Sequence, residues 1–365
     1  MIIADFIKEF EKLLPLQQAE DFDNVGLLCG SPQREISGIL VCHDALENVV
    51  DEAISKNLNL ILTFHPIIFY GLKSLTGKNY VEKSVLKAIE NKIAIYAVHT
   101  AFDNDFFGVN YGICKALGLT NRKILMPKTA NLKQLSVYVP SDFSEKMKEA
   151  LFAAGAGNIG FYDECSFSIS GNGTFRPVEG SNPFSGKQNI REEADEKMIS
   201  VIFESYKKSA VISAMKAAHP YEEVAYQIYQ LENENQYSGL GMTGELDKEM
   251  EEADFLEFVK DKFNLKIIRH SQFTGKKIKK IGVLGGSGAS GIKAALSTKC
   301  DVYMTGDLKY HDFFQAENRM LLCDIGHFES EQFVTQQLFE LLSENFTKFA
   351  ISKTNEKTNP VNYFL

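Results

Sequence analysis

The sequence predicts an α/β fold made of two α/β portions, with a smaller α+β domain inserted between them. Short apolar runs alternate with mixed stretches of helix length near the N-terminus, and the same alternation returns near the C-terminus. A chain of 365 residues with 44% hydrophobic content can bury more than one core. We therefore expect a first α/β portion at 1–128, an inserted domain at 129–238 and a second α/β portion at 239–365.

Both α/β portions contain predicted strands that are followed by stretches of helical character. In the first portion these strands are 36–42, 58–64 and 93–98. In the second portion they are 280–284, 301–305, 320–323 and 348–352. A repeated order of strand and helix is typical of a largely parallel sheet.

The middle of the chain has a different order of elements. Its predicted strands are 135–139, 165–170, 199–203 and 224–231, and its predicted helices are 144–154 and 208–218. This β-α-β-β-α-β order is that of a ferredoxin-like unit. The segment 171–196 is rich in Gly, Pro, Ser and Asn and is too long for a plain turn, so it predicts a long hairpin or a functional loop.

Composition excludes several classes of function. The net charge of -9 lacks the basic excess on which binding to a phosphate backbone depends, so we do not expect a nucleic-acid partner. No uncharged apolar run reaches the roughly 18 residues that a membrane span needs. The six cysteines lie far apart without a C-x-x-C pair, which is typical of a reducing compartment. We expect a cytoplasmic protein with no signal peptide.

Four residues form a candidate metal centre. His65, Asp103 and His327 each follow a different predicted strand, and ligands bind at the carboxyl ends of strands in open α/β sheets. Glu331 lies four residues after His327 on a predicted helix, so the two side chains share one helix face. The prediction requires that the two α/β portions share one cleft.

Two nitrogen and two oxygen donors fit zinc, iron, manganese or cobalt better than calcium. Such a site can generate hydroxide near neutral pH for hydrolysis. The alternative is structural: a histidine after a strand often forms only hydrogen bonds, and Glu331 would then be a solvated helix residue. A third interpretation is that the four residues pack the core and bind nothing.

Six motifs occur in order along nearly the whole chain. They are Asp21-Phe-Asp-Asn-Val-Gly-Leu, Phe64-His-Pro-Ile-Ile-Phe, His99-Thr-Ala-Phe-Asp, Gly285-Gly-Ser-Gly, Thr305-Gly-Asp-Leu-Lys-Tyr-His-Asp and Asp324-Ile-Gly-His-Phe-Glu-Ser-Glu. Together they resemble the NIF-three-like family, whose members carry the name GTP cyclohydrolase 1 type 2 homologue. The segments 171–186 and 219–226 resemble the extra domain of the longer members, which is similar to the small trimeric PII and CutA folds.

The resemblance implies a centre of two metal ions in a ring-shaped homohexamer. Its ligands correspond to His65, Asp103, His327 and Glu331. Phe64 stands where the family has the first histidine of an H-H-P motif, so one metal position loses a nitrogen donor. Three outcomes stay open: only one ion binds well, water and Glu331 hold the second ion weakly, or a neighbouring side chain compensates. The candidates for compensation are His43 and His99, each with a structural role as its alternative.

We expect a metal-dependent hydrolase that acts on a nucleotide-like or phosphoester substrate, with His311 or His99 transferring protons. His311, Asp44 and Asp307 are candidates for orienting the metal ligands or contacting the substrate. Gly285-Gly-Ser-Gly is either an anion cradle made by backbone amides or a tight turn between strand and helix. The alternative function is a non-catalytic regulatory or scaffold protein that binds metal and whose insert senses a small molecule. One or two divalent ions per chain are expected.

Overall fold

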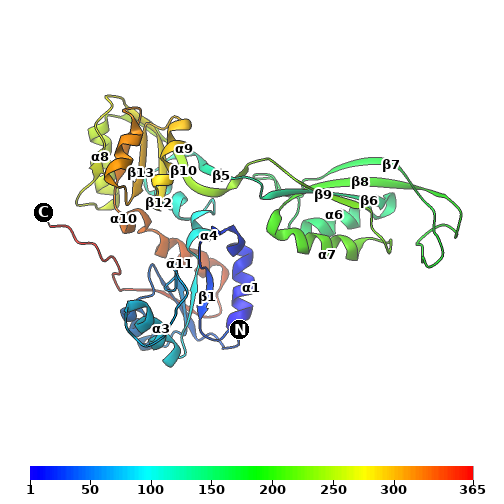
Figure 1. Cartoon of the computed structure of the whole chain (residues 1–365), viewed down its shortest axis with the longest axis horizontal. Coiled ribbons are helices and arrows are strands. Elements are labelled where there is room, and N and C mark those ends of the chain that lie inside the picture. Colours follow the sequence, from blue (N-terminus) through cyan, green and yellow to red (C-terminus); the bar gives the residue numbers. More distant parts are fainter. Residues whose placement is uncertain (365) are drawn as a thin grey trace. The chain divides into compact units, whose positions relative to one another are not determined.

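The computed structural model describes residues 1–364 and divides the chain into two compact units. Unit 1 combines Met1–Met126 with Ser238–Leu365, and unit 2 is Pro127–Tyr237. The two ends of the chain therefore fold together, with the middle inserted between them, in a mixed α/β architecture (Figure 1). Within residues 1–364, no helix combines the length and the apolar character that crossing a membrane requires.

The first sheet of unit 1 has five strands in the order β1-β4-β3-β2-β15. Their bounds are β1 Gly26–Cys29, β4 Ala94–Ala97, β3 Leu60–Thr63, β2 Gly38–Cys42 and β15 Ala350–Lys353. β15, β2, β3 and β4 are parallel, and β1 pairs antiparallel with β4. β2, β3 and β4 are buried along their whole length, as expected for parallel strands with both faces covered.

Two pairs of helices cover the faces of this sheet. The helices are α1 Ile3–Leu13, α2 Glu47–Ser55, α3 Tyr80–Glu90 and α11 Val334–Asn345. Apolar side chains of α1 and α11 share one buried cluster with the sheet, and those of α2 and α3 share another. Because helices lie on both faces, the apolar runs of the central strands are nearly continuous.

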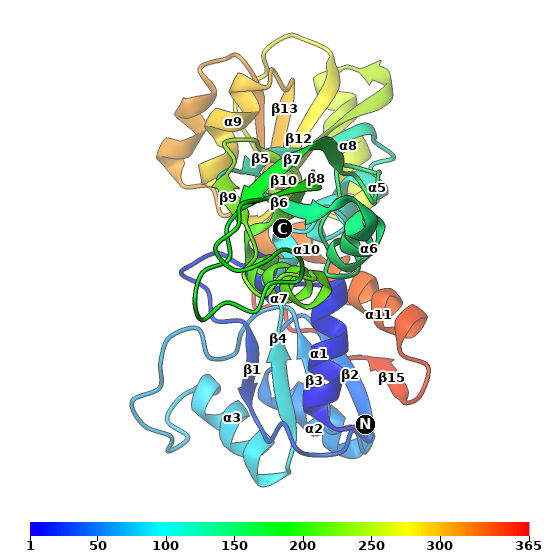
Figure 2. The same cartoon turned by 90° about the vertical axis from the view of Figure 1, so that its right-hand side faces the viewer.

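β15 corrects one part of the predicted organisation. The strand expected at 348–352 was assigned to the second α/β portion, but β15 pairs parallel with β2, with Ile351 opposite Ile39 (Figure 2). The helix that precedes it, α11, packs on the same first sheet. An apolar run identifies a strand without identifying its partner, so the sequence could not show this exchange between the two portions.

The second sheet of unit 1 has six strands in the order β11-β14-β13-β12-β10-β5. Their bounds are β11 Arg269–His270, β14 Leu321–Asp324, β13 Val302–Gly306, β12 Ile278–Ser287, β10 Asn235–Met250 and β5 Thr120–Lys128. β12, β13 and β14 are parallel, whereas β11 and β10 pair antiparallel with their neighbours β14 and β12. β10 contains three glycines and several charged residues, which explains why the apolar pattern did not predict it.

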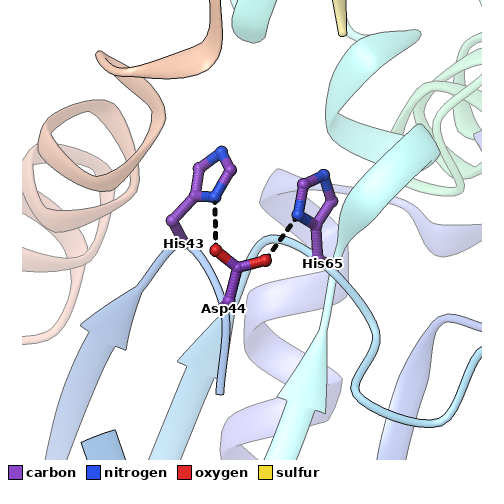
Figure 3. A group of neighbouring side chains, drawn as sticks. All are labelled: His43, Asp44 and His65. Carbon is purple, nitrogen blue, oxygen red and sulfur yellow. Dashed lines mark hydrogen bonds and ion pairs between the residues drawn. The ribbon is translucent and has the colours of Figure 1, made fainter. Parts of the chain in front are cut away.

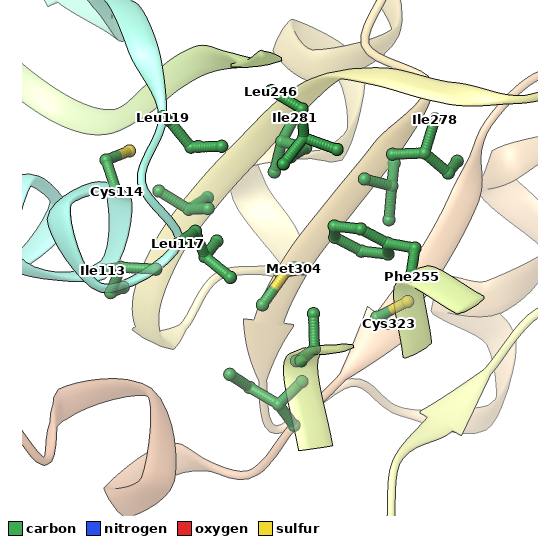
Figure 4. Close-up of a cluster of buried hydrophobic side chains, with 14 of the residues drawn as sticks. Ile113, Cys114, Leu117, Leu119, Leu246, Phe255, Ile278, Ile281, Met304 and Cys323 are labelled. Carbon is green, nitrogen blue, oxygen red and sulfur yellow. The ribbon is translucent and has the colours of Figure 1, made fainter. Parts of the chain in front are cut away.

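Helices also cover this second sheet. α5 Val109–Ala116 and α8 Glu252–Phe263 contribute to one buried cluster, which includes Phe255 and Met304 (Figure 4). α9 Ile292–Ser297 and the 3-10 helix η5 Tyr310–Ala316 contribute to the cluster on the other face. The remaining short elements of unit 1 are α4 His99–Asp103, α10 His327–Glu331, η1 Leu16–Gln18 and η4 Ala289–Gly291.

Unit 2 has the predicted β-α-β-β-α-β order. Its elements are β6 Leu132–Pro140, η2 Ser141–Phe143, α6 Ser144–Ala153, β7 Phe167–Phe175, β8 Glu192–Glu204, η3 Ser205–Lys207, α7 Lys208–Ala218 and β9 Tyr226–Gln230. The four strands form an antiparallel sheet in the order β7-β8-β6-β9, and both helices lie on one of its faces (Figure 1). This arrangement is ferredoxin-like.

The loop predicted at 171–196 is shorter than expected. β7 and β8 remain paired as far as Phe175 opposite Glu192, so the connection between them is 176–191. β7 is largely exposed along its length. Because both of its faces meet water, its second half lacks the apolar alternation of a strand, and the predicted strand 165–170 ended too early.

Candidate metal centre

The candidate ligands lie in unit 1, where the carboxyl ends of both sets of parallel strands meet. His43 follows β2 and His65 follows β3. From the second sheet, Asp307 follows β13, and His327 begins α10 shortly after β14. Carboxyl ends of parallel strands are the usual ligand-binding edge of such sheets. The cleft that the prediction required is therefore present within this unit.

Three imidazoles surround one carboxylate oxygen of Glu331, which is only 3% exposed. The Nε2 atoms of His43, His65 and His327 lie 3.1, 3.4 and 3.3 Å from its Oε2. A carboxylate oxygen offers about two lone-pair directions, so three nitrogens exceed what hydrogen bonding to this atom can satisfy. A cation shared by these groups would satisfy them.

The other ring nitrogen of each histidine is bonded to an aspartate. Asp44 lies between His43 and His65, and its two oxygens are each 2.8 Å from an Nδ1 atom (Figure 3). Asp307 Oδ2 lies 2.7 Å from Nδ1 of His327. Histidines that bind metals commonly donate their second N–H to a carboxylate, which fixes the ring and its tautomer. Nε2 is then the nitrogen left to act as a ligand.

Asp44 itself fits an orienting role better than a ligand role. His43, Asp44 and His65 are close enough together to be a candidate metal group. However, both oxygens of Asp44 are at ordinary hydrogen-bond distance from Nδ1 atoms, and the Thr358 hydroxyl donates to Oδ2 at 2.6 Å. The group formed by His65, His327 and Glu331 is the one whose Nε2 atoms face a shared carboxylate.

The turn before His327 is held by Asp324. Its Oδ1 accepts a hydrogen bond of 3.0 Å from the amide of Gly326, and its Oδ2 forms an ion pair of 2.8 Å with Arg269. Gly326 has a φ of 95°, a conformation that favours glycine. The turn directs α10 so that His327 and Glu331 lie on one side, one helical turn apart.

The Gly285-Gly-Ser-Gly motif supports the structural alternative. The amides of Gly285 and Gly286 donate to Oδ1 of Asn110 and Oγ of Ser330, at 3.0 and 2.9 Å. These two N–H groups are therefore already used inside the protein and do not form an anion cradle. A Cβ on Gly286 would lie 2.4 Å from Oε1 of Glu331. The motif lets the end of β12 approach the candidate ligand closely.

The carboxylate and the imidazoles of the cluster change one another's pKa values. Burial raises the pKa of Glu331, but hydrogen bonds from the three imidazoles outweigh burial and hold its pKa well below the ordinary value. Burial lowers the pKa of His65 and of His327, yet their carboxylate partners raise these values to about 10 and about 9. Raised pKa values favour the protonated rings, so a metal ion competes with protons for these nitrogens.

Asp103, on α4, is buried beside this charge. Burial and the negative charge of Glu331 raise the pKa of Asp103 well above its ordinary value. Its Oδ1 has no hydrogen-bond partner among residues 1–364. A buried carboxylate oxygen without a partner is costly unless a proton or a cation satisfies it. This fits a ligand role, although Asp103 belongs to neither close group of ligand atoms in the described chain, and the role stays a prediction.

A pocket of about 430 Å³ opens onto the centre. His43, His65 and His327 line it, together with Arg269, Asp307 and Tyr363. This volume is in the range of small-molecule sites.

Comparison with known proteins identifies the family. The model of the Duf34/NIF3 (NGG1p interacting factor 3) family matches residues 1–360. This chain belongs to the Duf34/NIF3 family. A Bacillus subtilis protein named GTP cyclohydrolase 1 type 2 homolog is 38% identical over 364 residues, which cover 98% of this chain and 94% of that protein.

Two solved structures have the same fold as this chain. A Bacillus cereus protein related to NIF3 superposes with a TM-score of 0.88 at 36% identity, covering 100% of this chain and 99% of that one. A Staphylococcus aureus protein superposes with a TM-score of 0.79 at 30% identity, with the same coverage.

The two predicted proton-transfer residues of this NIF3-family chain lie in different places. His99 is near the centre: its ring centroid is 5.2 Å from that of His65, and Asp23 Oδ1 lies 2.8 Å from its Nδ1. His311 is exposed on η5, with its ring 5.2 Å from that of Tyr310. Within the described chain, the residues that line the pocket do not include His311. Both catalytic roles stay predictions.

His43 was absent from the predicted ligand set and was considered only as a compensating or structural residue. The structure places it as close to Glu331 as the predicted histidines. The rule that selected His65 would have selected His43 as well, since both follow the end of a buried parallel strand within two residues.

Proposed function

We propose that this protein is a metal-dependent hydrolase that acts on a phosphoester or nucleotide-like substrate. The observation that carries the proposal is the convergence of three Nε2 atoms on one oxygen of Glu331, at 3.1 to 3.4 Å, beside a pocket of about 430 Å³. The name GTP cyclohydrolase 1 type 2 homolog, borne by relatives, makes GTP one substrate to test.

The residues that would hold the metal are His65, His327 and Glu331, with Asp103 as the fourth ligand. A donor set rich in imidazole and carboxylate suits zinc, iron, manganese or cobalt. When bound, such an ion acidifies water and polarises a substrate oxygen. The chain offers two orienting carboxylates for this purpose, Asp44 and Asp307, and both already hold their imidazoles.

Arg269 supports a substrate that carries negative charge. Its side chain is 53% exposed and lines the pocket. One guanidinium nitrogen pairs with Asp324 and another donates to the carbonyl of Leu308 at 3.0 Å. Because guanidinium has five N–H donors, others remain for a phosphate or carboxylate oxygen.

His99 is the better supported of the two proton-transfer candidates. Asp23 orients its ring beside His65, and the Thr100 amide donates to the same carboxylate at 3.0 Å. Catalytic bases are typically oriented in this way by a third group. Neither His99 nor His311 is among the described residues that line the pocket, and only His99 contacts a candidate ligand.

Turnover by metal-loaded protein tests the proposal. Protein loaded with Zn²⁺, Mn²⁺, Co²⁺ or Fe²⁺ would be assayed for ring opening of GTP and for hydrolysis of bis-p-nitrophenyl phosphate. We expect turnover that chelation removes and that His327→Ala abolishes, while His270→Ala, at an exposed position on β11, retains it. A wild type no faster than His327→Ala with every metal and substrate would refute catalysis.

A pocket in unit 2 favours a second function. It has a volume of about 410 Å³ and is lined by residues of both motifs of the insert, among them Phe175, Arg176, Phe184 and Tyr221. Glu196, Glu222 and Glu223 also line it. A pocket with aromatic rings, one cation and three carboxylates fits a small polar effector, as expected for a regulatory metal-binding protein. Effector binding without turnover would favour this alternative.

Three further proposals follow from the sequence and the family resemblance, and the oligomeric state rests on the resemblance alone. We propose that unit 2 is a PII-like or CutA-like domain, that the protein forms a homohexamer, and that it is cytoplasmic. The ferredoxin-like strand order of unit 2 is compatible with the first proposal. Sedimentation equilibrium of the full chain tests the second.

A further inference from the structure

Phe64 and His43 occupy equivalent places on neighbouring strands. β2 and β3 are parallel, and the last pair in their register is Cys42 opposite Thr63. The residues one step further along, His43 and Phe64, therefore lie opposite each other at the edge that holds the centre. Residues paired in this way point to the same side of the sheet, about 4.8 Å apart.

We propose that His43 is a metal ligand that replaces the nitrogen donor missing at Phe64. This inference rests on the proposed metal binding and extends it to a residue outside the predicted ligand set. The ligand class is a divalent ion of intermediate softness, such as zinc or cobalt, which accepts imidazole nitrogen.

Phe64 projects toward the centre but cannot contribute to it chemically. It is fully buried, and its ring centroid lies 5.5 Å from that of His43, 4.9 Å from that of His65 and 5.6 Å from that of His99. A phenyl ring has no lone pair to offer an ion. The side chain at this position thus fills space among three imidazoles.

His43 repeats each contact of the predicted ligand His65. In both residues Nδ1 lies 2.8 Å from an oxygen of the same carboxylate, Asp44 (Figure 3). Both direct Nε2 toward Oε2 of Glu331, and His43 is the nearer of the two, at 3.1 Å against 3.4 Å. His43 is only 5% exposed.

The structural alternative explains both ring nitrogens of His43 by hydrogen bonds, from Nδ1 to Asp44 and from Nε2 to Glu331 at 3.1 Å. His43 also packs on Phe328, with ring centroids 4.9 Å apart, so it contributes to the core. Packing on Phe328 uses only the ring of His43, and the bond to Asp44 uses only its Nδ1 atom. Nε2 is directed to an oxygen that His65 and His327 already approach, where three nitrogens exceed its two lone-pair directions. A ligand role accounts for the position of this atom.

The test is a donor exchange between positions 43 and 64. Zn²⁺ and Co²⁺ content per chain would be measured by elemental mass spectrometry after dialysis of the full chain, together with the visible absorption spectrum of the Co²⁺ form. The proteins are wild type, His327→Ala, His43→Leu, His43→Asn, Phe64→His and the double variant His43→Leu/Phe64→His. His270→Leu, at an exposed histidine on β11, is the matched control.

We expect each single change at position 43 to remove one ion per chain or to weaken its binding at least about tenfold, the size of effect expected when support of a metal site is lost. His43→Asn keeps a donor for Asp44 and loses only the nitrogen near Glu331, so it separates ligation from packing if His43→Leu unfolds. The double variant should regain the ion, and His270→Leu should match wild type in content and spectrum.

The outcomes separate this inference from the proposed function. If wild type retains no more metal than His327→Ala, the proposed metal centre itself fails. If wild type retains metal while folded His43→Asn has the same content and the same Co²⁺ spectrum, the centre stands and His43 is structural. Rescue by Phe64→His in the His43→Leu background would support the exchange, and failure of that rescue with intact folding would contradict it.

Discussion

The hydroxyl of Thr358 donates a hydrogen bond of 2.6 Å to Oδ2 of Asp44, the carboxylate that holds two histidines of the candidate centre. Thr358 is buried, and the residues that follow it, Asn359 to Val361, line the same pocket. A segment more than 300 positions along the chain from Asp44 therefore helps to fix the geometry of His43 and His65.

We predict that Thr358→Val weakens metal binding without removing it. Valine keeps the shape of threonine but leaves one lone pair of Asp44 unsatisfied, so the carboxylate orients its imidazoles less firmly. The loss of Zn²⁺ affinity should be up to about tenfold, at the low end of effects from outer partners of metal ligands. Competition titration with a chromophoric chelator measures it. Thr354→Val, whose hydroxyl bonds Glu52 instead, should leave affinity unchanged.

Replacing the orienting aspartates should weaken binding in proportion to the number of histidines each one holds. Asp44→Asn disturbs two imidazoles and Asp307→Asn only one. We expect a loss of about 10-fold to 100-fold in Zn²⁺ affinity for Asp44→Asn and a smaller loss for Asp307→Asn. Isothermal titration calorimetry would measure both. Equal losses for the two variants would contradict the assignment of Asp44 as the shared support.

Much of the site could be predicted because strand ends are visible in sequence. The apolar runs before His65 and His327 are buried parallel strands, and Glu331 shares a short helix with His327 as its spacing indicated. Apolar runs predicted four of the five strands of the first sheet and three of the six strands of the second. What the runs could not reveal was pairing. The assignment of strand 348–352 to the second α/β portion was therefore wrong, because β15 pairs with β2 in the first sheet.

The unpredicted parts depend on contacts between distant residues. The roles of His43 and Asp44 become apparent only from their contacts with Glu331 and Thr358, which lie near the other end of the chain. β10 and β7 were missed or shortened because one contains glycines and charges and the other is exposed. The pattern of apolar residues indicates burial. It does not predict a strand that is stabilised mainly by its neighbouring strands.

We predict that protonation of His219 makes unit 2 less stable in mild acid. Burial lowers the pKa of His219, and the neutral ring donates from Nε2 to the carbonyl of Tyr138 at 2.8 Å while Nδ1 accepts from the amide of Tyr221 at 3.0 Å. A second proton would remove that acceptor. Since the folded pKa lies below the unfolded value, the stabilisation is complete above about pH 6.5 and is lost as pH falls through the folded pKa.

Calorimetric melting of the full chain between about pH 8 and about pH 5 tests this effect. We expect His219→Asn to melt at a lower temperature than wild type near pH 8, since it loses one hydrogen bond, and to show a smaller further decrease in acid. His270→Asn, at an exposed position, is the control and should follow wild type. Parallel pH profiles for His219→Asn and wild type would refute the role of this histidine.

Gly286 allows a test of whether Glu331 depends on the close approach of the end of β12. Its φ is 66°, and a Cβ there would lie 2.4 Å from Oε1 of Glu331. Gly275 has a similar φ of 73° but nothing within 4 Å of the equivalent Cβ. Gly275→Ala should therefore cost only the backbone strain, about 1–2 kcal/mol of unfolding free energy. Gly286→Ala should cost this and also displace Glu331, so that Zn²⁺ affinity falls as well. Urea unfolding and zinc titration of both variants distinguish the two effects, and equal zinc affinity in the two would show that Glu331 does not depend on this approach.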